Sequence, residues 1–118
     1  MNKQVKKTDP KIAKPKGRML DPIAEAEVQT LFADLPRRRD LMIEALHRLQ
    51  DHFGALHARH LKALATWMRS SEAEVFEVAS FYHHFDIVKE GAGAPAAITI
   101  RVCDSLSCMM AGAETLLA

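Results

Sequence analysis

The chain has 118 residues, a formal net charge of +1 at pH 7, and 48% hydrophobic residues. This length and composition suit one modest globular domain, and no apolar run approaches the roughly 20 residues of a membrane span. The charged first residues lack the apolar stretch of a secretory signal, so we expect a cytoplasmic protein. In that reducing compartment, two close cysteines more often bind metal or do redox chemistry than form a structural disulfide.

Residues 1–18 carry seven lysine or arginine residues and one aspartate, a net charge of +6 that leaves −5 on the rest of the chain. With two prolines and few apolar side chains, the segment cannot offset its ordering entropy, so residues 1–20 are predicted to be a disordered basic tail. Such a tail is either an arm for an acidic partner or a solvated leader that aids solubility. No aromatic side chain alternates with the lysines, so we expect no nucleic-acid partner.

Residues 21–90 are predicted to form a helical bundle. Its first helix begins with Asp21 as the N-cap and Pro22 at the first helical position, and it ends near Pro36. The second helix runs from about 37 to 53. Its apolar face is formed by Leu41, Met42, Ala45, Leu46, Leu49 and Phe53.

After a glycine stop at Gly54, a third helix is predicted over roughly 57–68. The capping box of Ser71 and Glu74 opens a fourth helix, because each of the two side chains can satisfy a free N–H group at the helix start. The apolar residues of this fourth helix are Val75, Phe76, Val78, Ala79 and Tyr82.

Two histidine pairs, His57 with His60 and His83 with His84, have spacings that are conceivable in a metal site. No cysteine or carboxylate joins either pair in an obvious cluster, so we expect these side chains on solvated helix faces. The sequence also shows no pattern typical of a Ser-His-Asp or Cys-His catalytic site, so no catalytic residue is predicted.

The composition changes near residue 89. Residues 89–95 form a loop rich in glycine and alanine, and Ile98–Val102 alternates β-branched residues as a strand does. Residues 109–118 have the pattern of a helix start without a stop signal. Because a single strand needs a neighbour, residues 96–118 are predicted to be the first strand, cysteine loop and helix start of an incomplete domain.

The two cysteines of the chain, Cys103 and Cys108, lie between this strand and this helix. Two thiols separated by four residues in such a loop are how a protein presents half of a tetrathiolate metal or iron–sulfur site. Cys108 would begin a helix, where free N–H groups stabilise a thiolate. A lone C-x4-C spacing also fits two ordinary cysteines, and the C-x-x-C spacing of thioredoxin-type redox sites is absent.

Nearly the whole stretch from Lys16 to Ala118 carries a family resemblance. The matching residues are Arg39–His47, Gln50, Asp51, Gly54, Ala73–Tyr82, His84–Asp86, Val88–Gly91, Thr99–Ser105, Cys108, Gly112 and Ala113. In these residues the chain resembles the ferredoxin-like 2Fe-2S subunit of NADH dehydrogenases. It is still more similar to the N-terminal region of the beta subunit of NAD-dependent formate dehydrogenases, where the same module precedes a flavin module.

This resemblance implies an α+β fold, mostly α, in which an N-terminal helical bundle precedes the start of a thioredoxin-like 2Fe-2S ferredoxin domain. It implies that Cys103 and Cys108 are half of the ligand set of a 2Fe-2S cluster. The second cysteine pair of the family lies in a downstream C-x3-C loop that this chain lacks. FMN and NAD would bind only to a partner or downstream module, so the expected partners are a flavin/NAD-binding module and other subunits of the complex.

The expected function is therefore that of an electron-transfer segment of an NAD-linked oxidoreductase complex, most directly of the formate dehydrogenase type. Respiratory complex I and a hydrogenase diaphorase remain open as the parent complex. The chain reads as a fragment, so we expect no catalysis from it alone and no stable cluster on one copy, although two copies could pool four thiols. A helical protein-interaction module without a cofactor is the alternative function.

Overall fold

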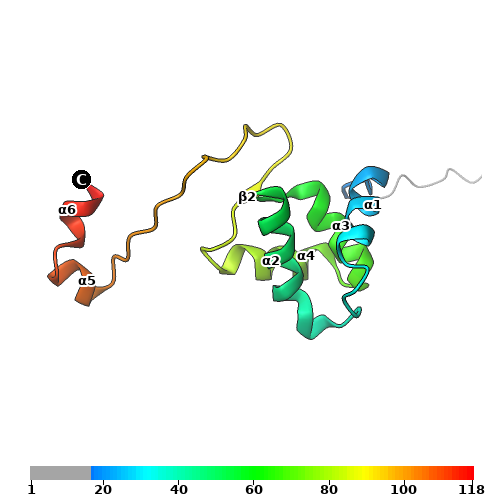
Figure 1. Cartoon of the computed structure of the whole chain (residues 1–118), viewed down its shortest axis with the longest axis horizontal. Coiled ribbons are helices and arrows are strands. Elements are labelled where there is room, and N and C mark those ends of the chain that lie inside the picture. The colour runs from blue at the N-terminus through cyan, green and yellow to red at the C-terminus, as the bar shows by residue number, and fades with distance from the viewer. Residues whose placement is uncertain (1–16) are drawn as a thin grey trace, which may run out of the picture.

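The computed structural model describes residues 17–118, and in it a helical bundle is joined by an extended segment to two short helices that lie apart (Figure 1). The helices of the bundle are α1 (Pro22–Leu31), the 3-10 helix η1 (Arg39–Leu41), α2 (Met42–Phe53), α3 (Ala58–Met68) and α4 (Glu72–Phe81). Two strands accompany them, β1 (Leu56–His57) and β2 (Ile87–Val88). The distant helices are α5 (Leu106–Met110) and α6 (Ala113–Leu117).

The helix caps that the sequence predicts are present. Asp21 Oδ1 accepts a hydrogen bond from the Ile23 N–H at 3.0 Å and caps α1. Gly54 closes α2 with a φ of +76°, a conformation that glycine adopts without a steric penalty. Ser71 and Glu74 form the reciprocal capping box at the start of α4.

Two predicted boundaries differ from the structure. The first helix ends at Leu31 rather than near Pro36, because the chain turns there and Leu35 N donates to Phe32 O at 3.0 Å. The second helix begins at Met42 rather than near residue 37, since a turn of 3-10 helix precedes it.

The hydrophobic core lies among α1, α2, α3 and α4. The predicted inner face of α2 is buried at Met42, Ala45, Leu46 and Leu49. The rings of Phe32 and Trp67 pack with their centroids 5.2 Å apart at one end of this core. Burying a large aliphatic side chain contributes about 1.5–3 kcal/mol, so the apolar faces are what hold the four helices together. The largest fully buried side chains are Phe32, Leu46, Leu49, Leu56, Leu64, His60, Val28 and Val75.

The strands β1 and β2 pair in parallel, with Leu56 opposite Ile87 and His57 opposite Val88. Parallel strands need a long crossover, and here α3 and α4 together form it. The sequence did not predict these strands, because two residues each are too few to show an alternating pattern. Their pairing brings the chain that follows α4 back beside the end of α2.

The predicted strand Ile98–Val102 is absent from the structure, and that prediction is wrong for the described chain. No neighbouring strand lies beside this segment in residues 17–118, so its side chains remain outside, with Ile98 and Ile100 80% and 83% exposed. The helix predicted over 109–118 is instead the pair α5 and α6, which begins earlier and is interrupted at Gly112 with a φ of +101°.

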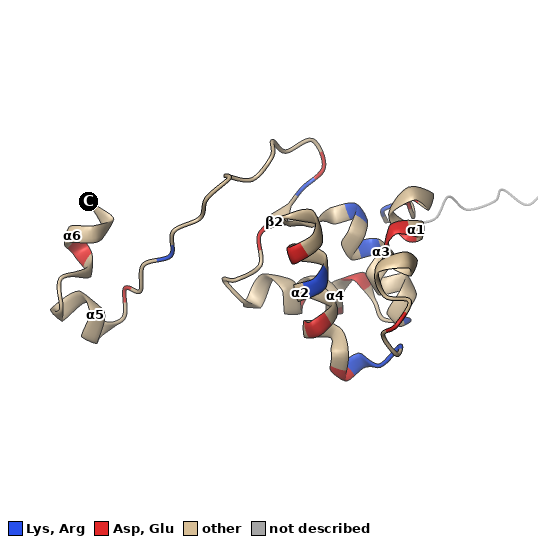
Figure 2. Cartoon of the chain, viewed as in Figure 1, with Lys and Arg blue, Asp and Glu red and all other residues tan. Residues whose placement is uncertain are grey.

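The predicted fold class, a mostly helical α+β chain, is confirmed, and the small sheet is parallel. Charged side chains are spread over the bundle, whereas the segment from residue 96 onward carries only Arg101, Asp104 and Glu114 (Figure 2). Within residues 17–118, no helix is long and apolar enough to cross a bilayer. The predicted disorder of the tail concerns mainly residues 1–16, which lie outside the described part.

Candidate metal centre

Cys103 and Cys108 lie at the start of α5, in the part of the chain that stands away from the bundle. Ser105 is the N-cap of α5, so Cys103 precedes the helix by three residues and Cys108 lies in its first turn. Both cysteines are free thiols; Cys103 is exposed and Cys108 is half-buried. The predicted position of Cys108 at a helix start is thus confirmed, although α5 has only five residues, whereas the strand predicted just before Cys103 is absent.

Ser105 acts directly on the first of these thiols. Its hydroxyl oxygen lies 3.2 Å from Cys103 Sγ. The Ser105 hydroxyl and backbone N–H, followed by the Cys108 thiol, hydrogen-bond to the sulfur and lower the pKa of Cys103 below that of an ordinary cysteine. The negative charge of Asp104 opposes this shift. Since the thiolate is the form that binds metal, the loop favours the ligand state of Cys103.

The donor set fits half of a 2Fe-2S cluster. Such a cluster takes four thiolates, two on each iron, and the loop offers Cys103 and Cys108. In residues 17–118, no three histidine, cysteine, aspartate or glutamate side chains gather closely enough to hold a metal ion. The described residues thus supply two of the four cluster ligands and no group near them that would complete the site.

The histidines belong to no metal-binding cluster within residues 17–118, and the sequence placed one of them wrongly. The His60 side chain is 1% exposed rather than solvated, and its ring stacks on Phe53 with the centroids 4.1 Å apart. His60 Nε2 lies 2.6 Å from Glu27 Oε2 on α1. No local pattern could have shown this, because Glu27 is 33 residues away in sequence. Desolvation lowers the pKa of His60 and so favours the neutral ring in the core, while the Glu27 carboxylate opposes this shift.

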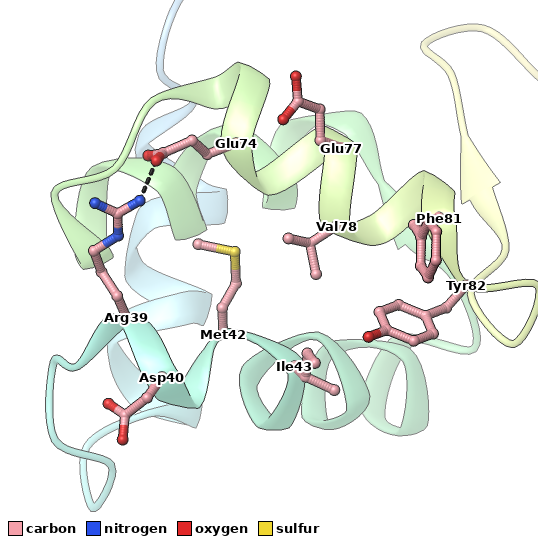
Figure 3. Close-up of a pocket in the computed structure, with 9 residues that line it drawn as sticks. All are labelled: Arg39, Asp40, Met42, Ile43, Glu74, Glu77, Val78, Phe81 and Tyr82. Atoms are coloured by element: carbon pink, nitrogen blue, oxygen red, sulfur yellow. Dashed lines mark hydrogen bonds and ion pairs between the residues drawn. The ribbon is translucent and has the colours of Figure 1, made fainter.

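A groove between α2 and α4 is the second notable surface of the bundle (Figure 3). It encloses about 560 Å³ over an apolar floor that includes Met42, Ile43 and Val78. Phe81 and Tyr82 stand at one end of the groove and remain 76% and 41% exposed. At the other end, the ion pair between Arg39 and Glu74 joins η1 to the start of α4. The sequence expected Tyr82 among the apolar residues of α4, but it did not predict the groove.

Comparison with protein families matches residues 28–118 to the family described as thioredoxin-like 2Fe-2S ferredoxin. Individual relatives agree with this match. The chain is 32% identical over 91 residues to NADH-quinone oxidoreductase subunit 2 of Thermus thermophilus, covering 75% of this chain and 48% of the relative. It is 31% identical over 88 residues to NADP-reducing hydrogenase subunit HndA of Solidesulfovibrio fructosivorans, with coverages of 75% and 48%.

A third relative is an NADH-quinone oxidoreductase subunit of Aquifex aeolicus, which is 32% identical over 82 residues, with coverages of 70% and 48%. The chain thus spans about half the length of these relatives. The matched residues include both cysteines, the α5 start and three of the four main bundle helices in full. This chain belongs to the thioredoxin-like 2Fe-2S ferredoxin family.

Proposed function

We propose that Cys103 and Cys108 are two of the four ligands of a 2Fe-2S cluster in an electron-transfer subunit of an NAD(P)-linked oxidoreductase complex. The observation that carries the proposal is the loop itself: two free thiols flank the N-cap Ser105 of α5, and the first of them contacts the Ser105 hydroxyl, within residues matched to a ferredoxin family. The names of the relatives, which include an NADH-quinone oxidoreductase subunit and an NADP-reducing hydrogenase subunit, support the kind of complex.

The residues of the loop have separate roles in this proposal. Cys103 and Cys108 would hold one half of the cluster, and Ser105 would favour deprotonation of Cys103 by stabilising its thiolate. The cluster would supply one-electron transfer when bound. The exposure of Cys103 leaves room for the two ligands that the described chain does not provide. They would come from polypeptide outside these 118 residues or from a second copy of the chain.

The parent complex that we propose is an NAD-dependent formate dehydrogenase, with FMN and NAD held by a partner or downstream module in the cytoplasm. Support comes from the resemblance of residues 39–47 and 73–82 to the beta subunit of those enzymes. This chain would carry electrons to or from that module and would catalyse no reaction alone.

The ligand assignment is tested in a fusion of this chain to the C-terminal half of the Thermus thermophilus relative, reconstituted anaerobically with iron and sulfide. We expect two irons per chain and a 2Fe-2S EPR signal after reduction. Cys103→Ser or Cys108→Ser should remove or strongly weaken both, because an alkoxide is a poor substitute for a thiolate on iron. Ser107→Ala, between the two cysteines, is the matched control and should keep both. Unchanged iron content and EPR signal in both cysteine variants would contradict the assignment.

A second candidate function is docking of a partner by the helical bundle without a cofactor, and the groove between α2 and α4 favours it. Exposed aromatic side chains such as Phe81 and Tyr82 are frequent anchors of protein interfaces. Glu77 lines the groove without an ion pair in the described part of the chain. The occupant that we propose is an apolar segment of the flavin/NAD-binding module that carries a basic residue opposite Glu77.

Isothermal titration calorimetry with that purified module tests docking at the groove, and cluster reconstitution in the fusion then separates the two candidates. We expect Phe81→Glu to weaken binding about ten-fold or more, as loss of an interface anchor does. Phe76→Glu is the matched control, because Phe76 is also an exposed phenylalanine of α4 but lines a different hollow. Equal binding by both variants would contradict docking at the groove. If the wild-type chain binds the flavin/NAD-binding module but the wild-type fusion takes up no iron–sulfur cluster, the cofactor-free interaction module is favoured.

A further inference from the structure

The segment that carries the cysteines is tied to the bundle by one side chain. Among described residues 95–118, every side-chain hydrogen bond or ion pair to the bundle comes from Arg101. Its Nε donates to His83 O at 3.1 Å, and its Nη2 donates to His84 O at 3.1 Å. The same Nη2 lies 3.4 Å from Asp86 Oδ1. The guanidinium therefore holds the turn that follows α4 at three points.

This turn, residues 83–86, is itself fixed to the bundle. Gln50 of α2, a half-buried side chain, donates from Nε2 to His84 O at 2.5 Å and accepts at Oε1 from Asp86 N at 2.7 Å. Phe85 is buried in the core, and Leu56 N of β1 donates to Asp86 O at 2.8 Å. The His84 carbonyl oxygen thus accepts from Gln50 on one side and Arg101 on the other. Arg101 is therefore attached to a turn that α2, β1 and the buried Phe85 already hold against the bundle.

The position of Arg101 in the chain links this attachment to the thiols. Two residues span at most about 7 Å of backbone, so a fixed Arg101 limits where Cys103 can lie. A guanidinium is a planar fork that can donate to two oxygens in a fixed geometry, whereas a lysine ammonium acts as a point charge on a flexible stem. We propose that Arg101 is a positioning residue that clamps the cysteine segment to the 83–86 turn and so fixes Cys103 relative to the bundle. Its role as support for a metal ligand rests on the function proposed above.

The clamp is tested by the distance between the bundle and Cys103, measured by double electron–electron resonance on the whole chain. Cys108→Ser leaves Cys103 as one labelling site, and Gln29→Cys on the exposed side of α1 supplies the other. We expect a narrow distance distribution with Arg101 present and one at least twice as broad with Arg101→Gln. Arg101→Lys should restore only part of the narrowing, because it keeps the charge opposite Asp86 and loses the fork. Lys89→Gln, which removes a positive charge from the same connecting segment, should change nothing.

The helix content and urea midpoint of the bundle should be the same in all four proteins, since Arg101 contributes nothing to the hydrophobic core. An unchanged distance distribution in Arg101→Gln would overturn the clamp, as would equal broadening by Lys89→Gln. A fall in the urea midpoint that accompanies the broadening would also overturn it, because Arg101 would then be supporting the bundle as a whole. The measurement needs no cluster, so it is independent of the reconstitution above. If Arg101→Gln broadens the distance distribution but Cys103→Ser and Cys108→Ser both retain iron, the cysteines are not cluster ligands. The clamp between Arg101 and the 83–86 turn would then still stand.

Discussion

Ser105 is the side chain that adjusts the reactivity of Cys103. Its hydroxyl and backbone N–H stabilise the thiolate and lower the pKa of Cys103, while Asp104 opposes them. We therefore expect a larger thiolate fraction at neutral pH than in an ordinary exposed cysteine, and faster alkylation.

We expect Ser105→Ala to slow alkylation of Cys103 by iodoacetamide at pH 7 and to shift the midpoint of its pH–rate profile upward. The measurement uses Cys108→Ser as the background, so that Cys103 alone reacts. Ser107→Ala in the same background serves as the control and should leave the profile in place. If Ser105→Ala leaves the midpoint of the pH–rate profile unchanged, the Ser105 hydroxyl does not lower the pKa of Cys103.

His60 should make the bundle less stable in mild acid. The unfolded chain protonates this residue near its ordinary pKa of about 6.5, whereas the folded chain, with its pKa lowered by desolvation, resists the proton. The stability that neutral His60 contributes is therefore fully present above the unfolded-state pKa. It is lost as the pH falls toward the folded-state pKa. His60 Nδ1 is buried without a hydrogen-bond partner among the described residues, so a proton there would have no acceptor.

Urea unfolding at pH 7.5, 6.5 and 5.5 measures this effect. The free energy of unfolding should fall with pH in the wild type, and His60→Gln should flatten that fall while lowering stability by about 1–3 kcal/mol through the lost buried contacts. His57→Gln, a less buried neighbour on β1, is the control and should keep the wild-type slope. An equal slope in wild type and His60→Gln would refute the assignment.

At the scale of elements, α4 depends on its N-terminal cap. Ser71 Oγ accepts from Glu74 N at 3.2 Å, and Glu74 Oε2 accepts from Ser71 N at 3.4 Å. Glu74 also pairs with Arg39 of η1, so one carboxylate serves the cap and one end of the groove. The cap thereby connects the start of α4 to the surface between α2 and α4.

Ser71→Ala should lower the free energy of unfolding by about 1 kcal/mol, the usual effect of losing a serine N-cap. Ser80→Ala near the other end of α4 is the matched control; its hydroxyl donates only to Glu77 O at 3.2 Å on an exposed surface. A change within about 0.5 kcal/mol is expected there. Equal losses in the two variants, from urea midpoints at constant m-value, would show that the cap itself is unimportant.

On the scale of the whole molecule, the bundle and the cysteine segment have unequal stability. All residues of the main hydrophobic core lie between Ala24 and Phe85. The helices α5 and α6 have five residues each and leave Leu106, Met110, Leu116 and Leu117 exposed. Helices this short are marginal without tertiary packing, so the bundle should unfold as the cooperative unit.

A chain shortened to residues 1–95 should therefore keep the urea midpoint of the 118-residue chain. The loss in free energy of unfolding should stay below about 1 kcal/mol, since the truncation removes only the exposed contacts of Arg101, one ion pair and two hydrogen bonds, and no side chain of the main core. Circular dichroism should show the same cooperative transition for both chains. Collapse of the transition on truncation would instead make residues 96–118 part of the folding unit, against the predicted domain boundary near residue 90.

The sequence by itself determined the features that depend on neighbouring residues. The Asp21 cap, the Gly54 stop, the Ser71–Glu74 box and the inner face of α2 all involve contacts within one helix or its ends, which composition and spacing reveal. The cysteine spacing and the family resemblance likewise pointed to the ferredoxin family, and the comparison confirmed it. The formate dehydrogenase assignment stays a prediction.

Only the tertiary structure decided what depends on segments far apart. The pairing of β1 with β2, the burial of His60 against Glu27 and the double hold of Gln50 and Arg101 on the 83–86 turn each join elements separated along the chain. The strand predicted at Ile98–Val102 failed for the same reason, because a strand needs a partner that local sequence cannot supply. Spacing along a chain reports local backbone preference, whereas burial and strand pairing are decided by which distant surfaces meet.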